Sequence, residues 1–468
     1  MNSQPNPRAS GTWRRRLGHA VSRLRLPLIN TLVTERYERS PHLPVEDPAQ
    51  VDEAIDIALR LGVVFLSCGA PTSDVQDAVF AAGAVLGLTG FEVDINFSSI
   101  SLSVPRQQGS PAQSAIRVVR TWHVNHARLA AAHRIMLDLS SERLDRAEVS
   151  ARLRVVETTE AGYGRTIVTL AFGVMAAAIV VSLGGNALTS AIAFGSAILV
   201  DLAGRFIGAR GAPAFFVNAV GALIASMVAV AFTAADADAP SALVVAGGIM
   251  ALLPGLSLVV ASQEAIGRFP VTAGARLIDL IAAAAGIVAG VLIALLIADK
   301  LDIAMIAAQR FATDRGIAWV GVIAAGIAAS ASAASSRSPI SMFLPAALAG
   351  ALGVAVLRGM ATVSHSEGAA TALAAAAVGV LAEGLARWRR VPPVLIIAPG
   401  VIPLLPGLTL YRGLLEYSQG RPSAGTADLV ESITLALALA AGVLFGELIS
   451  APHRRGARGG SDTMSAGR

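Results

Sequence analysis

The polar side chains that interrupt the long apolar runs of this sequence include Asp201, Asn218, Asp279, Glu383 and Glu431. A charge at the centre of a bilayer costs about 2.5–3.5 kcal/mol on insertion scales, so such residues usually have a function or a partner. A carboxylate that gains and loses a proton beside a substrate path is what proton coupling requires. We therefore predict that Asp201, Asp279 and Glu431 carry protons.

Local ion pairs are the alternative interpretation of these three carboxylates. Arg205 lies one helical turn after Asp201. Arg276 lies three residues before Asp279, and Glu431 lies at the start of its apolar run. Pairing with arginine near the membrane surface would account for the carboxylates without any role in transport.

A second candidate for chemistry is a helix-breaking motif that occurs twice. Residues 248–258 read GIMALLPGLSL and residues 400–410 read GVIPLLPGLTL, so Pro254 and Pro406 are 152 positions apart. Proline removes a backbone amide and glycine adds chain entropy, so both disfavour a helix interior. The amides and carbonyls freed at such a break can bind a substrate inside a membrane protein.

A zwitterionic amino acid suits a site of this kind. Its carboxylate fits a half-helix N-terminus, and its ammonium fits bared carbonyls or an acidic side chain. Hydroxyl groups just past each break could add contacts. The predicted substrate-binding residues are Pro254, Gly255, Ser257, Pro406, Gly407, Thr409 and Asn218. The alternative is that each Pro-Gly pair only kinks a membrane helix for packing.

The elements that carry these residues are apolar runs long enough to cross about 30 Å of hydrocarbon, roughly 20 residues each. Ten such spans are predicted, at about 165–184, 187–207, 212–234, 241–262, 275–298, 316–334, 339–357, 366–386, 394–414 and 428–450. Shifting the first five by 152 positions brings them onto the second five. Asp279 then matches Glu431, and Gly290 matches Gly442.

The register predicts an internal repeat whose second copy is inverted, because five spans per copy is an odd number. Most arginines of the span-connecting loops fall on one side if the N-terminus is cytosolic. We therefore predict a multi-pass protein of the cell inner membrane with both termini in the cytosol.

Composition supports a membrane protein with a separate soluble part. Apolar residues make up 54% of the 468 residues and charged residues only 15%. The predicted organisation is a disordered basic tail (1–47), a soluble α+β domain (48–163), transmembrane repeats at 164–300 and 316–450, and a disordered basic tail (451–468). The predicted fold class is an all-α polytopic membrane protein, with ten transmembrane helices as two inverted five-helix repeats, preceded by a small soluble α+β domain. No basic patch with aromatic residues accompanies the charge, so no nucleic-acid partner is expected.

In the soluble part, helical periodicity predicts helices over 51–66, 72–86, 127–138 and 146–159, with Thr72 or Ser73 as a cap. Alternating residues over 91–104 and 114–122 predict strands. His123, His126 and His133 lack a supporting ligand set, so they are expected to be solvated and no metal is predicted. Capping and surface roles are expected for Asp74, Asp77 and Asp94.

No catalytic residues or cofactors are predicted. The sequence contains no HExxH, no GxSxG and no phosphate-binding P-loop, which removes ATP as a direct energy source for this chain. The single cysteine, Cys68, cannot form an intramolecular disulfide.

Three features of the sequence occur together: the segment Gly69-Ala-Pro-Thr-Ser-Asp-Val-Gln-Asp77, the strand that begins at Phe91, and Leu-Leu-Pro-Gly-Leu in spans 4 and 9. In this combination the chain resembles the threonine/serine exporter family. The resemblance covers residues from about 50 to 450. The resemblance implies export of threonine and serine driven by the proton motive force, and it supplies no residue roles.

The resulting hypothesis is a secondary transporter, not an enzyme, whose partners are threonine, serine, protons and the lipid bilayer; a homo-oligomer is left open. The alternative from another class is a membrane-anchored hydrolase that cleaves a small amide or peptide in the soluble domain. Its missing feature is a nucleophile with an adjacent base.

Overall fold

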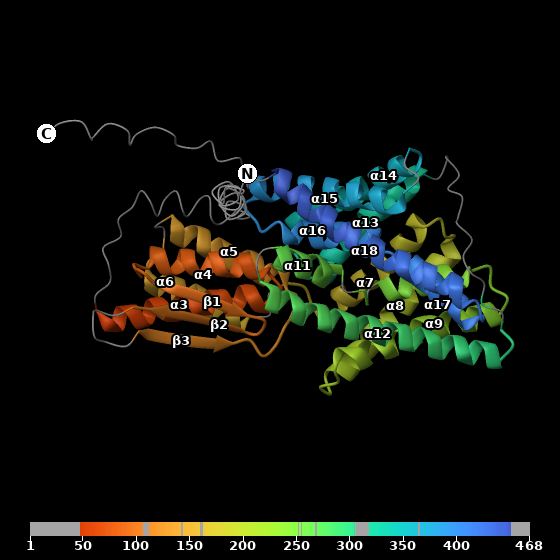
Figure 1. Ribbon diagram of the computed structural model, residues 1–468, viewed down its shortest axis with the longest axis horizontal. Coiled ribbons are helices and arrows are strands. Elements are labelled where there is room, and N and C mark those ends of the chain that lie inside the picture. The colour runs from red at the N-terminus through yellow and green to blue at the C-terminus, as the bar shows by residue number, and fades with distance from the viewer. Residues whose placement is uncertain are drawn as a thin grey trace, which may run out of the picture.

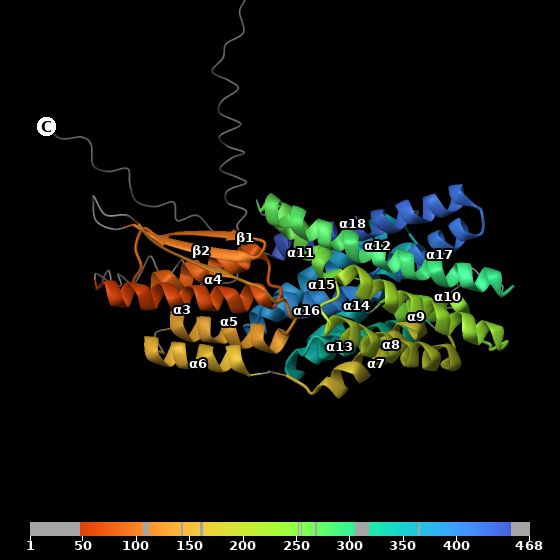
Figure 2. The ribbon, with the colours of Figure 1, turned by 90° about the horizontal axis from the view of Figure 1, so that it is seen from below.

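The computed structural model describes residues 47–105, 112–141, 144–159, 162–250, 252–253, 255–266, 269–303, 305, 318–363 and 366–450. A soluble domain lies at one end of a long helical bundle (Figures 1 and 2). The predicted tails lie outside the described residues except for Asp47, and Pro254 lies outside them as well.

The soluble domain has three layers. Its elements are α3 (Pro48–Ser67), α4 (Thr72–Val85), β1 (Glu92–Asn96), β2 (Ser99–Val104), β3 (Gln113–Val118), α5 (His126–Ser140) and α6 (Arg146–Thr158). The strands form an antiparallel sheet in the order β1-β2-β3. Helices α3 and α4 cover this sheet, and α5 and α6 pack on the far side of α3 (Figure 2). The apolar faces of α3 and α4 are therefore buried on both sides.

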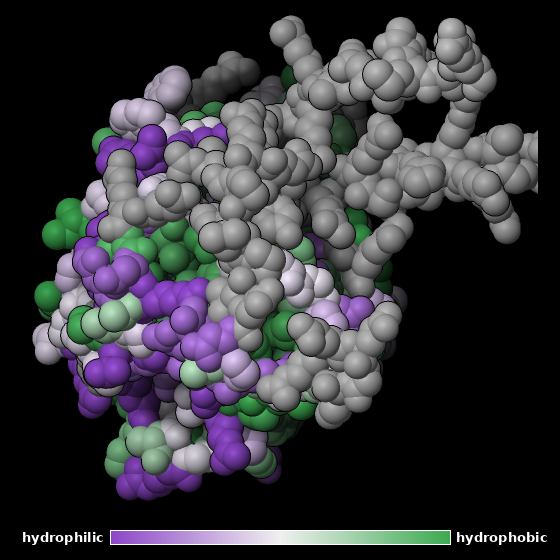
Figure 3. Space-filling model, turned by 90° about the vertical axis from the view of Figure 1, so that its left-hand side faces the viewer, coloured by the Kyte–Doolittle hydropathy of each residue, from purple (hydrophilic) through white to green (hydrophobic). Residues whose placement is uncertain are grey.

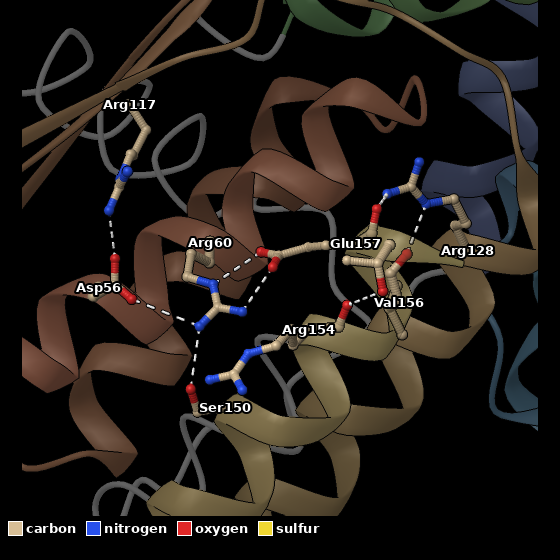
Figure 4. Close-up of polar contacts among 9 residues, drawn as sticks. Asp56, Arg60, Arg117, Arg128, Ser150, Arg154, Val156 and Glu157 are labelled. Carbon is tan, nitrogen blue, oxygen red and sulfur yellow. Dashed lines mark hydrogen bonds and ion pairs between the residues drawn. The ribbon is translucent and has the colours of Figure 1, made fainter. Parts of the chain in front are cut away.

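Ion pairs fasten the outer helix layer to the inner one (Figure 4). The Arg60 guanidinium donates to both carboxylate oxygens of Glu157, at 2.9 and 2.7 Å, and to the Ser150 hydroxyl. Arg128 donates to the carbonyls of Val156 and Glu157 at the end of α6. Paired two-point contacts of this kind fix orientation as well as distance.

The start of α4 differs from the sequence prediction. Its N-cap is Pro71, with no capping side chain, and Thr72 is the first residue of the helix. The prediction that Thr72 or Ser73 caps α4 is therefore wrong. The Thr72 hydroxyl instead donates to Glu264 of a membrane helix, because the start of α4 is packed against the bundle.

The bundle contains two successive groups of helices. The first is α7 (Arg165–Ser182), α8 (Ala187–Gly208), α9 (Ala214–Ala234), α10 (Ser241–Met250), α11 (Gly255–Ile266) and α12 (Pro270–Lys300). The second is α13 (Ala318–Ser335), η1 (Ile340–Met342), α14 (Phe343–Ala361), α15 (Glu367–Arg389), α16 (Val394–Val401), η2 (Ile402–Leu404), α17 (Gly407–Ser418) and α18 (Pro422–Ser450).

Seven of the described helices are long and apolar enough to cross a membrane, or up to eight if a bent pair counts as one span. The bent pair is residues 394–404 with 407–418, which turns by 40°. Helix α10 has only 10 residues because the helix ends at Met250, before α11 begins. Helices α12 and α18 have 31 and 29 residues and extend beyond the predicted spans. The protein is thus a multi-pass membrane protein.

Equivalent helices of the two groups pack in the same way. Helix α9 lies along α12, and α15 lies along α18. A side chain at Gly290 would strike the Ala219 carbonyl, and one at Gly442 would strike the Ala372 carbonyl. These glycines let both helix pairs approach closely, as small residues do in membrane bundles.

The surface of the protein changes character along its length. The end formed by the soluble domain shows mainly hydrophilic residues among its coloured atoms (Figure 3). The bundle instead exposes large apolar side chains such as Phe206, Ile278, Trp319, Leu344 and Ile433. An apolar outer surface of this kind suits hydrocarbon.

Candidate functional site

The two helix breaks meet inside the bundle. Gly407 begins α17 directly after the second break and is buried. The Cβ position of Gly407 lies 3.0 Å from Met250 Sδ and 3.2 Å from Leu253 Cδ1, both of the first break. Helix α10 packs on α17, and α11 contacts α16. Two segments 152 positions apart in sequence therefore lie against each other.

Next to the first break is a buried hydroxyl that the sequence prediction missed. The Cβ position of Gly248 lies 3.0 Å from Ser196 Oγ of α8. Ser196 is 1% exposed, and its hydroxyl has no hydrogen-bond partner among the described residues. A buried hydroxyl without a partner costs free energy, so it marks a place where a ligand could bind.

The structure separates the predicted substrate-binding residues into two groups. Gly255, Pro406 and Gly407 lie at the breaks, and Ser257 and Thr409 follow in half-buried positions on α11 and α17. Asn218 instead donates to the Ala283 carbonyl at 3.4 Å, in the contact between α9 and α12. Pro254 is outside the described residues.

The predicted proton carriers have three different environments. Asp201 pairs with Arg205 of the same helix, and Arg205 also contacts Thr169. Asp279 is exposed, and the arginine expected beside it, Arg276, pairs with Glu264 instead. Glu431 is half-buried and lines an open groove between α15 and α18.

A further polar site lies between the soluble domain and the bundle. Here a cavity of about 60 Å³, which we call the junction chamber, is enclosed by α4, α5, α11, α15 and α18. Its polar lining residues are Ser73, Asp74, Asp77, His133, Gln263, Glu383 and Glu447. Four carboxylates from both parts of the protein therefore share one small space.

Two of these carboxylates form side-chain hydrogen bonds within the bundle. Gln263 Nε2 donates to both oxygens of Glu447, at 2.9 and 2.8 Å. Glu383 accepts from Arg387 of the same helix, at 3.1 and 2.9 Å. Glu447 and Glu383 are 7% and 3% exposed, so both carboxylates are removed from water.

The soluble-domain groups of the chamber have shifted titration. Burial raises the pKa of Asp74 to about 7, and repulsion by Asp77 and Glu383 adds to the effect. Burial lowers the pKa of His133 to about 4, although a hydrogen bond to the Arg390 backbone acts in the opposite direction and raises this pKa. His133 is therefore neutral at pH 7, and its Nδ1 has no hydrogen-bond partner among the described residues.

These positions correct two sequence predictions. His126 and His133 are 1% and 4% exposed rather than solvated, because α5 packs against the bundle. Asp74 and Asp77 line the chamber rather than the outer surface. The prediction dismissed both aspartates, although the Gly69–Asp77 segment that carries the family resemblance contains them. Glu447 lies within the predicted span 428–450, so the signal that singled out Glu383 applied to it as well and was overlooked. Nothing in the sequence alone pointed to Gln263.

Two buried contacts hold the soluble domain on the bundle beside the chamber. Thr72 Oγ1 donates to Glu264 Oε1 at 2.6 Å, and Glu264 also accepts from Arg276 at 2.8 Å. His126 Nδ1 lies 2.8 Å from Ser338 Oγ, which follows α13. One contact reaches the first group of helices and the other reaches the second.

The described residues include no group of three or more histidine, cysteine, aspartate or glutamate side chains arranged to hold a metal ion.

Comparison with known proteins identifies the family. A family model described as "Putative threonine/serine exporter" matches residues 56–298. A second, described as "Threonine/Serine exporter, ThrE", matches residues 321–449. No solved structure matches the chain.

Two curated relatives match most of the chain. A protein named "Threonine/serine exporter" from Corynebacterium glutamicum is 31% identical over 425 residues, which cover 89% of this chain and 86% of the relative. A protein named "Probable threonine/serine exporter" from Mycobacterium tuberculosis is 32% identical over 420 residues, which cover 88% of this chain and 79% of the relative. The resemblance found in the sequence is thereby confirmed, and this chain belongs to the threonine/serine exporter family.

Proposed function

We propose that this protein exports threonine and serine from the cytosol and that the proton motive force drives the export. Membership of the family and the names of both relatives support the substrate class. The observation that carries the mechanism is the contact of Gly407 with Met250 and Leu253, which brings the two helix breaks together inside the bundle.

An inverted repeat of two five-span units would give this protein alternating access. Its support is the direction of matching helices. Helix α7 leaves the soluble domain, whereas α13 runs toward it and ends beside His126. The fourth predicted span ends at the soluble domain, where Glu264 of α11 contacts Thr72, whereas the matching ninth span begins there with α16, after Pro393 of the chamber. Matching elements thus run in opposite directions, as inverted repeats require.

The substrate site in this proposal lies where the breaks meet. The start of α17 offers its free backbone amides to the substrate carboxylate, as helix N-termini do for anions. Ser257 and Thr409, with the buried hydroxyl of Ser196, supply hydrogen bonds. Ser196 adds to the residues predicted from the sequence because it lies beside Gly248 and has no partner.

Proton coupling requires a carboxylate that changes its charge during transport. Asp201, Asp279 and Glu431 remain the predicted carriers. Moving one charge through 100 mV supplies about 2.3 kcal/mol, which sustains a roughly fifty-fold solute gradient. The entry of one proton per exported substrate molecule therefore supplies enough free energy for export.

The proposed orientation has the soluble domain and both termini in the cytosol of a cell with the protein in its inner membrane. Asp94 is exposed on β1 and offers a labelling site. In a Cys68→Ala background, Asp94→Cys should react with a membrane-impermeant maleimide only after the cells are opened. Labelling of intact cells would contradict the orientation.

Flux into proteoliposomes tests the function directly. Purified full-length protein, an imposed pH gradient and labelled threonine or serine should give uptake that an uncoupler abolishes. Thr409→Val should raise KM, whereas Glu148→Gln, an exposed residue of the soluble domain, is the matched control. Flux no greater than that of empty liposomes would refute the proposal.

The hydrolase alternative requires a nucleophile that substrate can reach. A buried serine–histidine contact joins Ser338 and His126, which are 0% and 1% exposed. The surrounding protein leaves no approach to this pair. Amide hydrolysis by the full-length protein that is lost in Ser338→Ala would favour the alternative over export.

A further inference from the structure

The junction chamber has a composition that the helix breaks do not account for. Asp74 and Asp77 of α4, Glu383 of α15 and Glu447 of α18 line a cavity of only about 60 Å³. Arg387 is a cationic side chain that pairs with this group, through Glu383. Like charges confined this closely resist full ionisation unless a cation joins them.

The chamber also offers hydrogen-bond acceptors that have no donor. Nδ1 of His133 is buried and lacks a partner among the described residues. The same holds for Oε1 of Gln263, whose Nε2 is already used by Glu447. A buried polar atom without a partner costs about 1–3 kcal/mol, so a structure that keeps two of them in one cavity points to a missing donor.

These acceptors match one chemical group. A primary ammonium carries one positive charge and three N–H donors. The chamber supplies a carboxylate, the Gln263 oxygen and the His133 nitrogen, which makes three acceptors around one space. His133 is neutral at pH 7, so it accepts a hydrogen bond and does not repel a cation.

The size of the cavity limits what can enter. A water molecule needs about 10–15 Å³ of such space, so about 60 Å³ fits an ammonium group with a few neighbouring atoms or waters. A whole amino acid does not fit. The chamber can therefore recognise the head group that amino acids share, while the side chain must be selected elsewhere.

We infer that the junction chamber is a binding site for the primary ammonium group of a small amino acid, and that this group and protons occupy the chamber in turn. The inference rests on the proposed function and adds a second substrate contact, on the soluble-domain side of the helix breaks. When the ammonium binds, a protonated carboxyl gives up its proton and becomes the counter-ion. One positive charge enters and one leaves, so the exchange balances.

The titratable and amide groups that face one another in the chamber come from five helices, of which α18 gives Glu447. Helix α4 gives Asp74 and Asp77, α5 gives His133, and α15 gives Glu383 with Arg387. Helix α11 gives Gln263, and its neighbour Glu264 is held by Thr72 and Arg276. Falling pH fills the carboxylates with protons, so ammonium binding weakens as pH falls.

Calorimetry on full-length protein in lipid nanodiscs tests the inference. The probes are L-threonine, 2-aminoethanol, which keeps the ammonium and lacks the carboxylate, and N-acetyl-L-threonine, which lacks the ammonium. We expect 2-aminoethanol to bind weakly and to compete with threonine, and N-acetyl-L-threonine not to bind. Titrations in two buffers of different ionisation enthalpy should reveal proton release from the wild-type protein.

Two carboxamide variants with matched controls locate the site. Glu447→Gln and Asp74→Asn should weaken 2-aminoethanol binding by roughly 10-fold to 100-fold, because charged hydrogen bonds contribute about 1.5–3 kcal/mol. Both should also reduce proton release. Asp94→Asn in the soluble domain and Glu367→Gln at the opposite end of α15 are exposed and should leave both measurements unchanged.

The outcomes separate this inference from the proposed function. Two results would refute the inference that the chamber binds the ammonium group. One is wild-type threonine binding without proton release, and the other is binding that both variants leave unchanged. The wild-type buffer comparison needs no variant, so it decides the matter even if a variant fails to fold. Threonine flux is measured separately in proteoliposomes. Absent flux alongside ammonium-dependent binding would reject export while supporting the chamber.

Discussion

The two groups of helices share a scaffold but differ in the polar atoms placed on it. In the first, the Cβ position of Gly248 meets the hydroxyl of Ser196 at 3.0 Å. In the second, the matching Gly400 meets the methyl group of Ala349 at 2.9 Å. The nearest atom to the Cβ position of Gly248 is also a methyl group, that of Ala225 at 2.7 Å, so the hydroxyl of Ser196 is an additional contact at the first break. The two break regions thus pack alike on apolar atoms and differ in this hydroxyl.

The ion pairs between the last two helices of each group show the same difference. In the first, Arg276 of α12 pairs with Glu264 of α11 at 2.8 Å. In the second, Asp428 of α18, 152 positions after Arg276, pairs with Arg412 of α17 at 3.1 Å. The charge is reversed between the matching positions 276 and 428, whereas Glu264 matches Glu416 and Arg412 matches the apolar Val260. The first pair is also buried beneath the soluble domain, which the second never touches.

Removing the arginine of the buried pair should have the largest effect. Arg276→Ala leaves Glu264, whose side chain is 0% exposed, without its counter-ion, and we expect a loss of about 3–5 kcal/mol. Asp428→Asn affects a more exposed pair and should cost only about 1 kcal/mol. Thermal unfolding in detergent measures both. The double variant Glu264→Gln with Arg276→Met should recover much of the loss. Equal destabilisation by the two single changes would contradict the difference between the halves.

The glycine contacts should instead behave alike in the two halves. Gly290→Val and Gly442→Val each drive a side chain into backbone of the neighbouring helix, and overpacking of this kind costs about 1–3 kcal/mol. The yield of monodisperse protein and its unfolding temperature measure the cost. Gly274→Ala and Gly384→Ala are controls on α12 and α15, since a Cβ at either glycine meets nothing within 4 Å. A loss of stability confined to one of the two variants would contradict the prediction that both halves pack in the same way.

The chamber, where both halves meet the soluble domain, should give opposing pH effects on stability. Asp74 has a pKa raised from 3.8 to about 7, so it keeps its proton when folded and lowers stability as pH rises through that window. His133 has a pKa lowered from 6.5 to about 4, so the unfolded chain binds more protons there and stability rises with pH between those values.

Variants separate these two effects. In Asp74→Asn, the unfolding temperature should climb from pH 4 to pH 6.5 more steeply than in the wild type. In His133→Gln, the decline of the unfolding temperature toward pH 7 should begin at a lower pH than in the wild type. Unfolding temperatures across this pH range supply the measurement, with Asp94→Asn as the control. Parallel curves for all four proteins would show that the chamber does not titrate as described.

The smallest expected effect concerns the hydroxyl that distinguishes the two breaks. Ser196→Ala should raise the KM for threonine by roughly 3-fold to 10-fold, since one neutral hydrogen bond contributes about 0.5–1.5 kcal/mol. Its unfolding temperature should stay the same or rise, because an unpaired buried hydroxyl is removed. Ser226→Ala removes another buried, unpaired hydroxyl and should leave KM unchanged. A KM unaffected by Ser196→Ala would remove this residue from the site.

Much of the fold could be predicted from the sequence. Helical periodicity and capping reflect local physics, so the helices of the soluble domain lie within a few residues of their predicted ranges. Hydrophobicity located the apolar helices, and the repeated Leu-Leu-Pro-Gly-Leu located both breaks. The limits of α12 and α18 were missed because they extend past the hydrocarbon into polar sequence, where apolar composition no longer marks a helix.

The candidate sites were less accessible to sequence reasoning. A local rule suggested that Arg276 pairs with Asp279, three residues away, yet it pairs with Glu264 because α11 and α12 pack side by side. His126 and His133 were expected to be solvated because no metal-ligand set accompanies them in the sequence. The sequence of α5 does not show that the bundle covers this helix.

What the sequence by itself determined is therefore local: where helices form, where they break, and that the breaks recur at one offset. Only the tertiary structure decided which polar groups share a space. Asp74, His133, Gln263, Glu383 and Glu447 come from five helices spread over the chain, and no short-range pattern links them. These five residues meet because the soluble domain packs on the bundle. The apolar area buried by that packing comes from other residues, and the packing fixes the distances between the five polar side chains.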